Sequence, residues 1–314
     1  MKKTILTIAA LAAAAICAFA QEEEQKPVYW TRSADFDLGF NQTGLTNWAA
    51  GGYNTVSLAA GVDAKANYAR DLMSWNNRLQ LNYGFLWSAD KSNLLQKSTD
   101  RIYLESKWAY KTGPESKWNY TASYTFRSQF TNSFDNYQQD ADSRKWSGTL
   151  KSGFISPAYT NIALGMEWKP NEWFNMNVAP LTGGFTICTI EDLRKGYGMK
   201  LLEDGLDPSA GSNYHAALFQ FGAEVKINAK AVVNDVLTYD TQLVLFTDYL
   251  NKPFEYNRVN WDNKITWKAA KFFKVSLDTW LVYDPIVTIN EVTSLTQFKE
   301  FFSISFTYTL TDKK

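Results

Sequence analysis

The sequence predicts an all-β protein, a single antiparallel transmembrane β-barrel of about 12 strands that follows a cleaved signal peptide. Long segments of the chain alternate apolar and polar residues. The connections between these segments are alternately short and long, and aromatic residues, 16% of the sequence, gather beside the short ones. Together these features are typical of bacterial outer-membrane barrels, which have short periplasmic turns and longer external loops.

Residues 117–130 show the alternation most clearly. Trp118, Tyr120 and Tyr124 fall on one parity with other apolar residues, whereas the residues between them, and Arg127, are polar or small. Alternate side chains of a strand point to opposite faces, so this segment has one aromatic face and one polar face. It is longer than the roughly 9–11 residues that a tilted strand needs to cross a bilayer.

The same alternation recurs along the chain. Clear examples occupy residues 75–87, 101–110, 217–227, 237–249, 259–267, 273–283 and 302–310. Weaker predicted strands occupy residues 35–42, 54–68, a long piece ending at Trp168, and 173–189. Short connections fall near residues 70–71, 113–114, 170–171, 233–234 and 270–271, and long ones near 42–53, 88–98, 131–148, 190–212, 250–256 and 286–296. Counting strands between them gives about twelve, an even number, with both barrel ends of the chain on the short-turn side.

One stretch leaves the strand count open. Residues 146–168 are long for one strand, and Pro157 and residues 180–184 are positions where a bulge or an extra turn is expected, because proline cannot donate to a β-ladder. A barrel of about 14 strands is therefore the alternative. No change of composition divides the rest of the chain, so we expect one domain.

The N-terminus has the layout of a secretory signal. A short basic start precedes the apolar residues 4–16, and Ala-Phe-Ala at residues 18–20 fits the small-residue rule for signal peptidase. Lipid attachment at Cys17 is the alternative, but Ile16 is too large for that signal. We therefore expect a signal peptide at residues 1–20, a periplasmic segment at 21–32 and the barrel at 33–314.

Composition argues against several classes of function. Loss of Lys2 and Lys3 with the signal peptide leaves two more acidic than basic residues, so no nucleic-acid partner is expected. Cys188 is then the one remaining cysteine, which precludes an internal disulfide. The mean hydropathy is −0.32, and no later apolar run is long enough for a membrane helix. We expect no cofactor and no metal.

Aromatic residues predict two belts at the strand ends. Those beside the short connections are Tyr68, Trp75, Trp108, Tyr110, Trp118, Tyr120, Trp168, Trp173, Trp267, Phe272 and Phe273. Amphipathic rings favour the headgroup level, so this group predicts the periplasmic girdle. The predicted outer girdle contains Trp87, Phe130, Tyr249, Tyr256 and Phe298. The alternative, packing in a β-sandwich core, gives no reason for rings to collect at one end of the strands.

The segment G-F-N-Q-T-G-L-T-N-W-A-A-G-G at residues 39–52 resembles an uncharacterised family of outer-membrane β-barrel proteins of Bacteroides-type Gram-negative bacteria, of which N-W-x-x-G-G is the most recognisable part. Further similar stretches are residues 156–159, 165–171, 180–183, 248–250 and 260–261. The resemblance implies a barrel in the outer membrane and brings no reaction and no ligand. Residues 311–314 follow the last strand here, whereas such chains often end on its aromatic residue.

Trp48, Gly51 and Gly52 form the most distinctive local feature and are candidates for a gating loop. In the functional hypothesis, this loop folds into the lumen and gates it or contacts a sugar ring. In the structural alternative, the glycines permit a positive φ in a tight turn and Trp48 anchors the loop by burial.

Charged residues on the polar parity predict the lumen wall. They are Arg78, Arg101, Glu105, Lys107, Arg127, Glu224, Lys226, Asp240, Arg258, Asp262, Lys264, Lys274 and Asp278. Two interpretations stay open: opposite charges cross-link and plug the interior, or they face each other across a pore narrower than that of the 16–18-stranded porins. The near balance of sign predicts no strong ion preference.

Neither the single histidine nor the acidic loops predict a chemical site. His215 lies at the long-loop end of its strand and no G-x-S-x-G motif is present, so a rim residue is favoured over a catalytic base. The acidic residues 135–142 and 203–207 carry several possible Ca²⁺ ligands, but neither stretch matches the EF-hand pattern. Solvated loop charge is the favoured interpretation.

The sequence therefore predicts a non-enzymatic outer-membrane barrel that forms a narrow pore, binds a small polar solute or scaffolds an envelope complex. An outer-membrane lipid-modifying enzyme and a secreted carbohydrate-binding β-sandwich are the alternatives. Expected partners are outer-membrane lipids, the barrel-assembly machinery and a small polar solute. The identity of the solute and the oligomeric state stay open.

Overall fold

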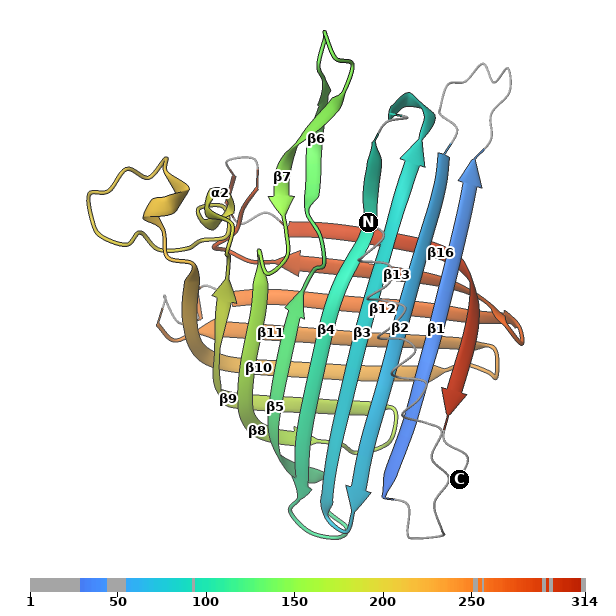
Figure 1. Cartoon of the computed structure of the whole chain (residues 1–314). Coiled ribbons are helices and arrows are strands. Elements are labelled where there is room, and N and C mark those ends of the chain that lie inside the picture. Colours follow the sequence, from blue (N-terminus) through green and yellow to red (C-terminus); the bar gives the residue numbers. More distant parts are fainter. Residues whose placement is uncertain are drawn as a thin grey trace.

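The described part of the chain forms a closed β-barrel (Figure 1). The computed structural model describes residues 29–43, 55–91, 94–250, 254–255, 257–289, 292–293 and 296–311. Within them, twelve antiparallel strands close in the order β1-β16-β13-β12-β11-β10-β9-β8-β5-β4-β3-β2. The predicted fold class and the count of twelve are confirmed, whereas fourteen barrel strands and a β-sandwich are excluded.

The barrel strands are long and nearly all join their sequence neighbours. Their bounds are β1 (Trp30–Thr43), β2 (Thr55–Arg70), β3 (Met73–Ser88), β4 (Leu95–Lys111), β5 (Trp118–Ser128), β8 (Ala158–Trp168), β9 (Phe174–Ile187), β10 (Ala217–Val232), β11 (Leu237–Asp248), β12 (Asn257–Ala270), β13 (Phe273–Tyr283) and β16 (Thr296–Thr311). β1 begins at Trp30, so it includes the end of the segment that the sequence analysis placed in the periplasm.

The two walls of the barrel cross steeply. In Figure 1, β1–β5 run upright on the near side and β10–β13 run crosswise behind them. A sheet closes into a barrel only when its strands tilt relative to the barrel axis, so opposite walls cross at about twice the tilt. Strands of 11 to 17 residues are long enough to cross a bilayer at such a tilt.

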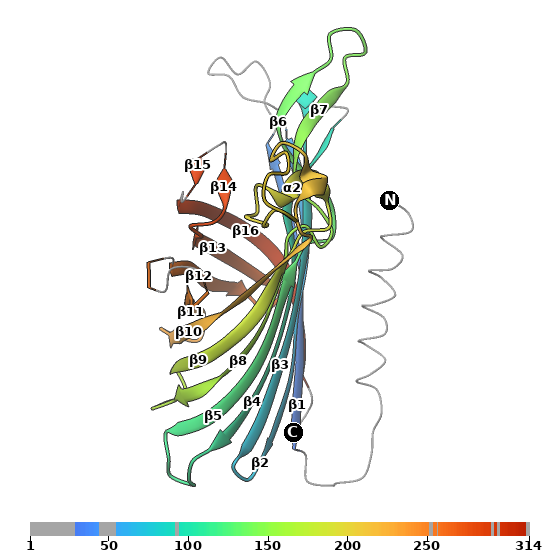
Figure 2. The ribbon, with the colours of Figure 1, turned by 90° about the vertical axis from the view of Figure 1, so that its left-hand side faces the viewer.

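The connections alternate in length, as predicted. Short turns join β2 to β3, β4 to β5, β8 to β9, β10 to β11 and β12 to β13. The long connections at the other end carry η1 (Ala89–Lys91), the hairpin of β6 (Ser133–Gln139) and β7 (Trp146–Ser152), α2 (Glu191–Arg194), η2 (Gly211–Asn213), and the pair β14 (Thr288–Ile289) and β15 (Val292–Thr293). Figure 2 shows the β6–β7 hairpin projecting well beyond the rim. Among the described helices, none is long and apolar enough to span a membrane.

The long predicted piece that ends at Trp168 is two strands in different sheets. β7 pairs with β6 outside the barrel, whereas β8 pairs with β5 and β9 within it. Pro157 lies between them, directly before the first residue of β8, where a missing N–H costs no ladder hydrogen bond. The extra turn expected at Pro157 is therefore present, but it leads out of the barrel and adds no barrel strand.

A β-bulge interrupts β9 at the second position where the sequence predicted an irregularity. Between the aligned pairs Met166–Val178 and Leu164–Leu181, β9 has one residue more than β8, and its register against β10 shifts as well. Pro180 lies at this bulge with its side chain exposed. Because of the extra residue, the inward-facing residues of β9 have odd numbers before the bulge, such as Asn177, and even numbers after it, such as Thr182 and Thr186. Polar side chains therefore face inward on both sides of the bulge.

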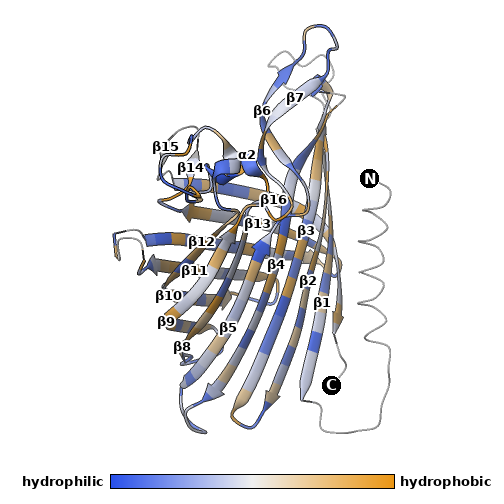
Figure 3. Cartoon of the chain, turned by 60° about the vertical axis from the view of Figure 1, so that its left-hand side comes forward, coloured by the Kyte–Doolittle hydropathy of each residue, from blue (hydrophilic) through white to orange (hydrophobic). Residues whose placement is uncertain are grey.

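The side chains of the strands sort to two faces, as predicted. On β5, Trp118, Tyr120 and Tyr124 are exposed outward, whereas Asn119 and Thr121 between them are buried. Figure 3 shows apolar and polar bands alternating along the other strands too. An apolar exterior around a polar interior is the arrangement of a membrane barrel.

Aromatic rings gather at the strand ends beside the short turns. Exposed members of the predicted inner girdle are Trp75, Trp108, Tyr110, Trp118, Tyr120, Trp173, Trp267, Phe272 and Phe273. At the other end, Tyr249 and Phe298 are exposed, whereas Tyr256 lies outside the described residues. Phe130 follows β5, which ends at Ser128, and its ring packs edge-on against Tyr83 at 6.4 Å.

Candidate functional site

The structure places the charged residues predicted for the lumen on the inward faces of their strands. Opposite residues of an antiparallel pair share a face, and the pairing aligns Arg78 with Glu105 and Lys264 with Asp278. Continued around the ring, this register puts every predicted residue on the same side of the sheet as the buried Asn119. The barrel interior is thus the surface on which a function inside the protein would act.

Six of these thirteen charges are ion-paired with a residue on a neighbouring strand or two strands away. The pairs are Arg78–Asp63 at 2.6 Å, Lys107–Glu167 at 2.6 Å, Lys274–Asp37 at 2.6 Å, Lys264–Asp278 at 3.3 Å and Lys230–Asp240 at 3.8 Å. Such pairs compensate the desolvation of charges that face a narrow interior.

Two ion pairs reach across the lumen. Arg101 Nη2 on β4 lies 3.4 Å from Asp262 Oδ2 on β12. Lys226 Nζ on β10 donates to Glu105 Oε1 on β4 at 2.6 Å. Strand β4 is six steps from β12 and four steps from β10 in the ring of twelve. These contacts cross-link opposite walls, so the passage inside the barrel is constricted at this level.

A cavity of about 80 Å³ lies beside these cross-links. Its charged lining residues are Arg101, Arg127, Glu224, Lys226, Arg258 and Asp262. The rings of Tyr103 and Tyr159 and several uncharged polar side chains complete the wall. Six of the thirteen residues predicted for the lumen wall therefore meet at one cavity. The others, such as Arg78 and Lys264, lie elsewhere on the interior face.

Two arginines flank Tyr159 at this cavity. The guanidinium carbon of Arg127 lies 4.8 Å from the centre of the Tyr159 ring, and that of Arg258 lies 5.9 Å from it. Arg258 Nε also lies 2.8 Å from Asp284 Oδ2, and its Nη2 donates to Gln220 Oε1 at 2.8 Å. Asp284 directly follows β13, so this arginine connects the cavity wall to a loop at the outer rim.

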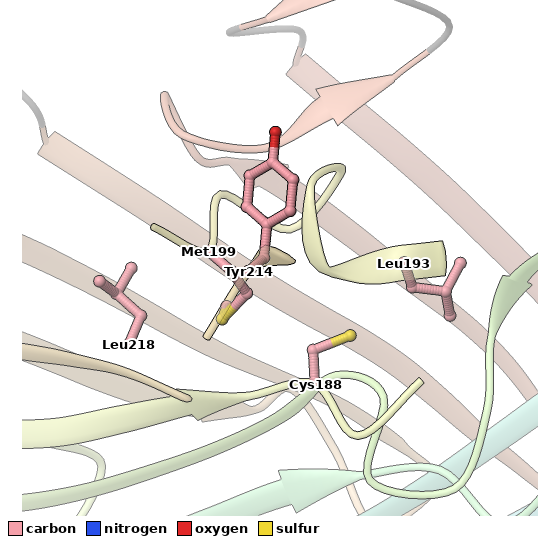
Figure 4. Packing of buried hydrophobic residues seen from close by; sticks show 5 residues of the cluster. All are labelled: Cys188, Leu193, Met199, Tyr214 and Leu218. Carbon is pink, nitrogen blue, oxygen red and sulfur yellow. The ribbon is translucent and has the colours of Figure 1, made fainter. Parts of the chain in front are cut away.

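The connection between β9 and β10, here named the α2 loop (residues 188–216), packs over the outer end of the barrel. Its buried core comprises Cys188, Leu193, Met199 and Tyr214, which pack with Leu218 of β10 (Figure 4). Ile190, Tyr197 and Leu201 of the loop join them, together with Leu150 of β7 and Ile286 of the β13–β16 connection.

The α2 loop bridges two other connections of the outer rim. Tyr197 Oη donates to Lys151 O at 2.8 Å on the β7 side, and the Thr288 backbone N–H donates to Gly196 O at 3.0 Å on the β13–β16 side. Burial raises the pKa of the Tyr197 hydroxyl, and the neighbouring Tyr159 hydroxyl raises it further. The loop therefore covers part of the mouth.

Glycine is required where the α2 loop meets the β13–β16 connection. Gly198 has φ +73°, a conformation that side chains disfavour. A Cβ atom at this position would also lie 2.9 Å from Ile286 O. The close approach of these two loops therefore depends on the missing side chain.

The predicted gating residues Trp48, Gly51 and Gly52 lie outside the described residues. His215 is exposed just before β10, and its backbone N–H donates to Lys200 O at 2.9 Å. No hydrogen bond joins the His215 side chain to another residue of the described chain. It lies at the rim, as expected from the sequence.

The acidic loops hold their carboxylates by local backbone hydrogen bonds. Asp140 Oδ1 accepts from the Ser143 N–H at 2.7 Å, and Asp207 Oδ1 accepts from the Ser209 N–H at 2.8 Å. These donors lower the pKa of both carboxyl groups. Within the described ranges, no group of three or more His, Cys, Asp or Glu side chains is arranged to hold a metal ion.

The sequence analysis missed the acidic partners of several lumen cations. They are Asp37, Asp63, Glu167 and Asp284. Asp37 and Asp63 lie on strands whose alternation is weak in the sequence, and Glu167 lies in the piece whose strand assignment was uncertain. The parity of each strand, once its bounds are known, would have found the first three. Asp284 lies beyond its strand, where parity carries no signal.

Comparison with known proteins extends the resemblance noted from the sequence. A family model described as a protein of unknown function (DUF3078) matches residues 40–134, under a third of the chain. The match includes most of the segment at residues 39–52, and the later similar stretches lie outside it. No curated protein matches the chain.

Several solved outer-membrane proteins are similar in overall shape. An outer-membrane channel from Pseudomonas putida F1 has 10% identity and a TM-score of 0.38, with 92% of this chain and 100% of that chain covered. The NanC porin has 9% identity and a TM-score of 0.38, with coverage of 87% and 98%. The Pseudomonas putida toluene transporter TodX has 8% identity and a TM-score of 0.31, with coverage of 91% and 88%.

Proposed function

We propose that this chain is an outer-membrane protein of a Gram-negative bacterium whose barrel passes or holds a small polar solute. The observation that carries the proposal is the charge-lined cavity inside a closed barrel with an apolar exterior. Charged side chains are costly to bury, even when they are paired. A barrel that served only as an anchor would gain more stability from an apolar filling. The charged wall therefore supports an aqueous function of the interior.

The topology supports one orientation in the membrane. Outer-membrane barrels have their short turns in the periplasm and their long loops outside. In this orientation the α2 loop and the β6–β7 hairpin face the exterior, and the inner girdle faces the periplasm. A solute from outside would then pass the α2 loop before it reached the cavity.

The chemistry of the interior supports binding and conduction rather than a reaction. Four of the six charged residues that line the cavity are held in ion pairs, and Arg127 contacts the Tyr159 ring. His215 lies at the rim, away from the cavity lining. We therefore retain a channel without covalent chemistry over a lipid-modifying enzyme.

A closed envelope scaffold is the second candidate. Two observations favour it: the ion pairs that cross the lumen, and the α2 loop that covers part of the mouth. Both reduce the free cross-section of the barrel. A scaffold would use its outer loops, including the projecting β6–β7 hairpin, and would need no open path.

Single-channel recording of the purified protein in a planar bilayer tests the proposal. We expect a small and steady conductance, because two ion pairs cross the passage and narrow it. Protein that is folded, as judged by a heat-modifiable band on gels, but electrically silent would favour the scaffold. Membrane fractionation tests the location separately, and recovery away from outer-membrane markers would overturn it.

A further inference from the structure

Two charged residues of the cavity wall have no ion-pair partner among the described residues. They are Arg127 on β5 and Glu224 on β10. The other charges that line the cavity are neutralised in the pairs Arg101–Asp262, Lys226–Glu105 and Arg258–Asp284. One positive and one negative charge thus remain at a single small cavity.

Both residues are placed to receive a ligand. The Arg127 guanidinium stacks over the Tyr159 ring, with 4.8 Å from its carbon to the ring centre, and this contact uses its face and leaves its N–H edge available. Glu224 has 8% of its surface exposed, so its carboxyl group is largely removed from bulk water. A buried charge without a partner is unfavourable, and a ligand of opposite charge relieves that cost.

We propose that the cavity binds a small zwitterion of the α-amino acid type, an inference that rests on the proposed solute function of the barrel. The carboxylate of the ligand would receive hydrogen bonds from the N–H edge of Arg127, and its ammonium group would donate to Glu224. A cavity of about 80 Å³ suits this size, since it offers room for roughly five to eight water molecules.

The presence of one unpaired positive and one unpaired negative side chain explains why neither a simple anion nor a simple cation fits as well. A bound anion would compensate Arg127 but leave Glu224 uncompensated, and a cation would do the reverse. A zwitterion leaves no net charge behind, which agrees with the balance of sign along the whole lumen wall. The Tyr103 and Tyr159 rings add wall area for a short aliphatic side chain.

Unused hydrogen-bonding capacity beside the cavity agrees with a polar ligand. Arg101 Nε and Asn260 Oδ1 are buried without a hydrogen-bond partner among the described residues, and both residues belong to the cavity lining. An unpaired buried polar atom is costly. A polar ligand in the cavity that reached either atom would supply the missing partner.

Three ligands of one shape test the proposal on the wild-type protein. L-Alanine is a zwitterion, L-lactate replaces its ammonium with a hydroxyl group, and isopropylamine replaces its carboxylate with a methyl group. Calorimetric titration of the folded barrel in detergent should show alanine binding roughly tenfold or more tighter than the other two. Equal or tighter binding of lactate would overturn the proposal in favour of an anion site, and the same result for isopropylamine in favour of a cation site. Binding of none of the three overturns it outright.

Matched variants test whether Arg127 contacts the carboxylate of the ligand and Glu224 its ammonium group. Arg127→Gln should weaken alanine binding roughly tenfold and leave isopropylamine unchanged, and Glu224→Gln should weaken alanine similarly and leave lactate unchanged. Lys264→Gln, inside the barrel but outside the cavity lining, is the control and should bind alanine like the wild type. Equal losses for all three variants would contradict the assignment. Intact conductance without alanine binding would overturn this inference alone, whereas alanine binding by a silent barrel would overturn only conduction.

Discussion

Arg101 and Asp262 meet across the barrel, with 3.4 Å between Nη2 and Oδ2, although their strands lie six steps apart in a ring of twelve. The two side chains are 23% and 28% exposed, so water reaches both. Together with Lys226 and Glu105, they cross-link the walls of the barrel interior. The resistance of the passage therefore depends on two contacts.

Removal of the first cross-link should widen the passage. We expect Arg101→Ala to raise the single-channel conductance roughly twofold, because the guanidinium no longer spans the lumen and Asp262 is freed to attract cations. Arg78→Ala is the matched control, since Arg78 pairs with Asp63 on the neighbouring strand and crosses nothing. If both variants conduct like the wild type, the cross-link does not limit the pore.

The outward face of β5 gives a stability prediction. Tyr124 is exposed in the middle of this strand, where the barrel exterior meets lipid. Tyr124→Arg should reduce the free energy of unfolding by about 2–4 kcal/mol, because an arginine near the bilayer midplane loses its hydration. Denaturant titration of the barrel in lipid vesicles measures this, with Tyr124→Phe as the near-neutral control. An unchanged midpoint for the arginine variant would show that this face does not meet lipid.

The strands of this barrel could be predicted because two simple patterns coincide in the sequence. Apolar and polar residues alternate along each strand, and short and long connections alternate between strands. On β5 and β10, alternation sorts side chains to lipid or lumen without help from the rest of the fold. The same alternation also suits a solvent-exposed hairpin, so β7 could not be told from a barrel strand by pattern alone, and β6 lies within a segment that was predicted as a long connection. The inward face of β9 changes from odd to even residue numbers at a bulge. Pro180 marked the position of this bulge in the sequence, but did not show that β9 has one extra residue there.

The cavity could be predicted only in its ingredients. The sequence identified Arg101 and Asp262 as lumen residues, but 161 positions separate them, and their contact depends on the strand order and stagger of the closed barrel. Likewise, Arg127 and Glu224 have no ion-pair partner because the neighbouring cations and anions pair with one another. Alternation reports the face of a residue and carries no information on its level along the axis or on its partner.

The bulge in β9 gives a prediction about chain length. Deletion of Pro180 should leave a regular strand with unchanged faces, because the residue removed is the one that β8 and β10 do not match. Deletion of Gly183 should instead turn Phe185 toward the lumen and Thr186 toward lipid. The bulge stays in place while the residues after the deletion shift by one position, which reverses their faces. The heat-modifiable band on gels measures folding. We expect it for the first deletion and not for the second, and loss in both cases would mean that the bulge itself is required.

The buried thiol of Cys188 reports on the α2 loop. Cys188 has no exposed surface, and burial raises the pKa of its thiol, so little of the reactive thiolate is present at pH 8. Maleimide labelling of the folded protein should therefore be slow. A change that lifts the α2 loop from the β13–β16 connection should expose the thiol and accelerate labelling.

Gly198→Val is such a change, because Gly198 has φ +73° and an added Cβ would lie 2.9 Å from Ile286 O. We expect it to accelerate labelling of Cys188 roughly tenfold, since the thiolate is the reacting species and both access and ionisation increase. Gly205→Val is the matched control: Gly205 also has a positive φ, of +90°, but an added Cβ would meet nothing within 4 Å. Equal acceleration by both variants would attribute the effect to backbone strain. No acceleration by either would show that the α2 loop does not need this contact to cover the mouth.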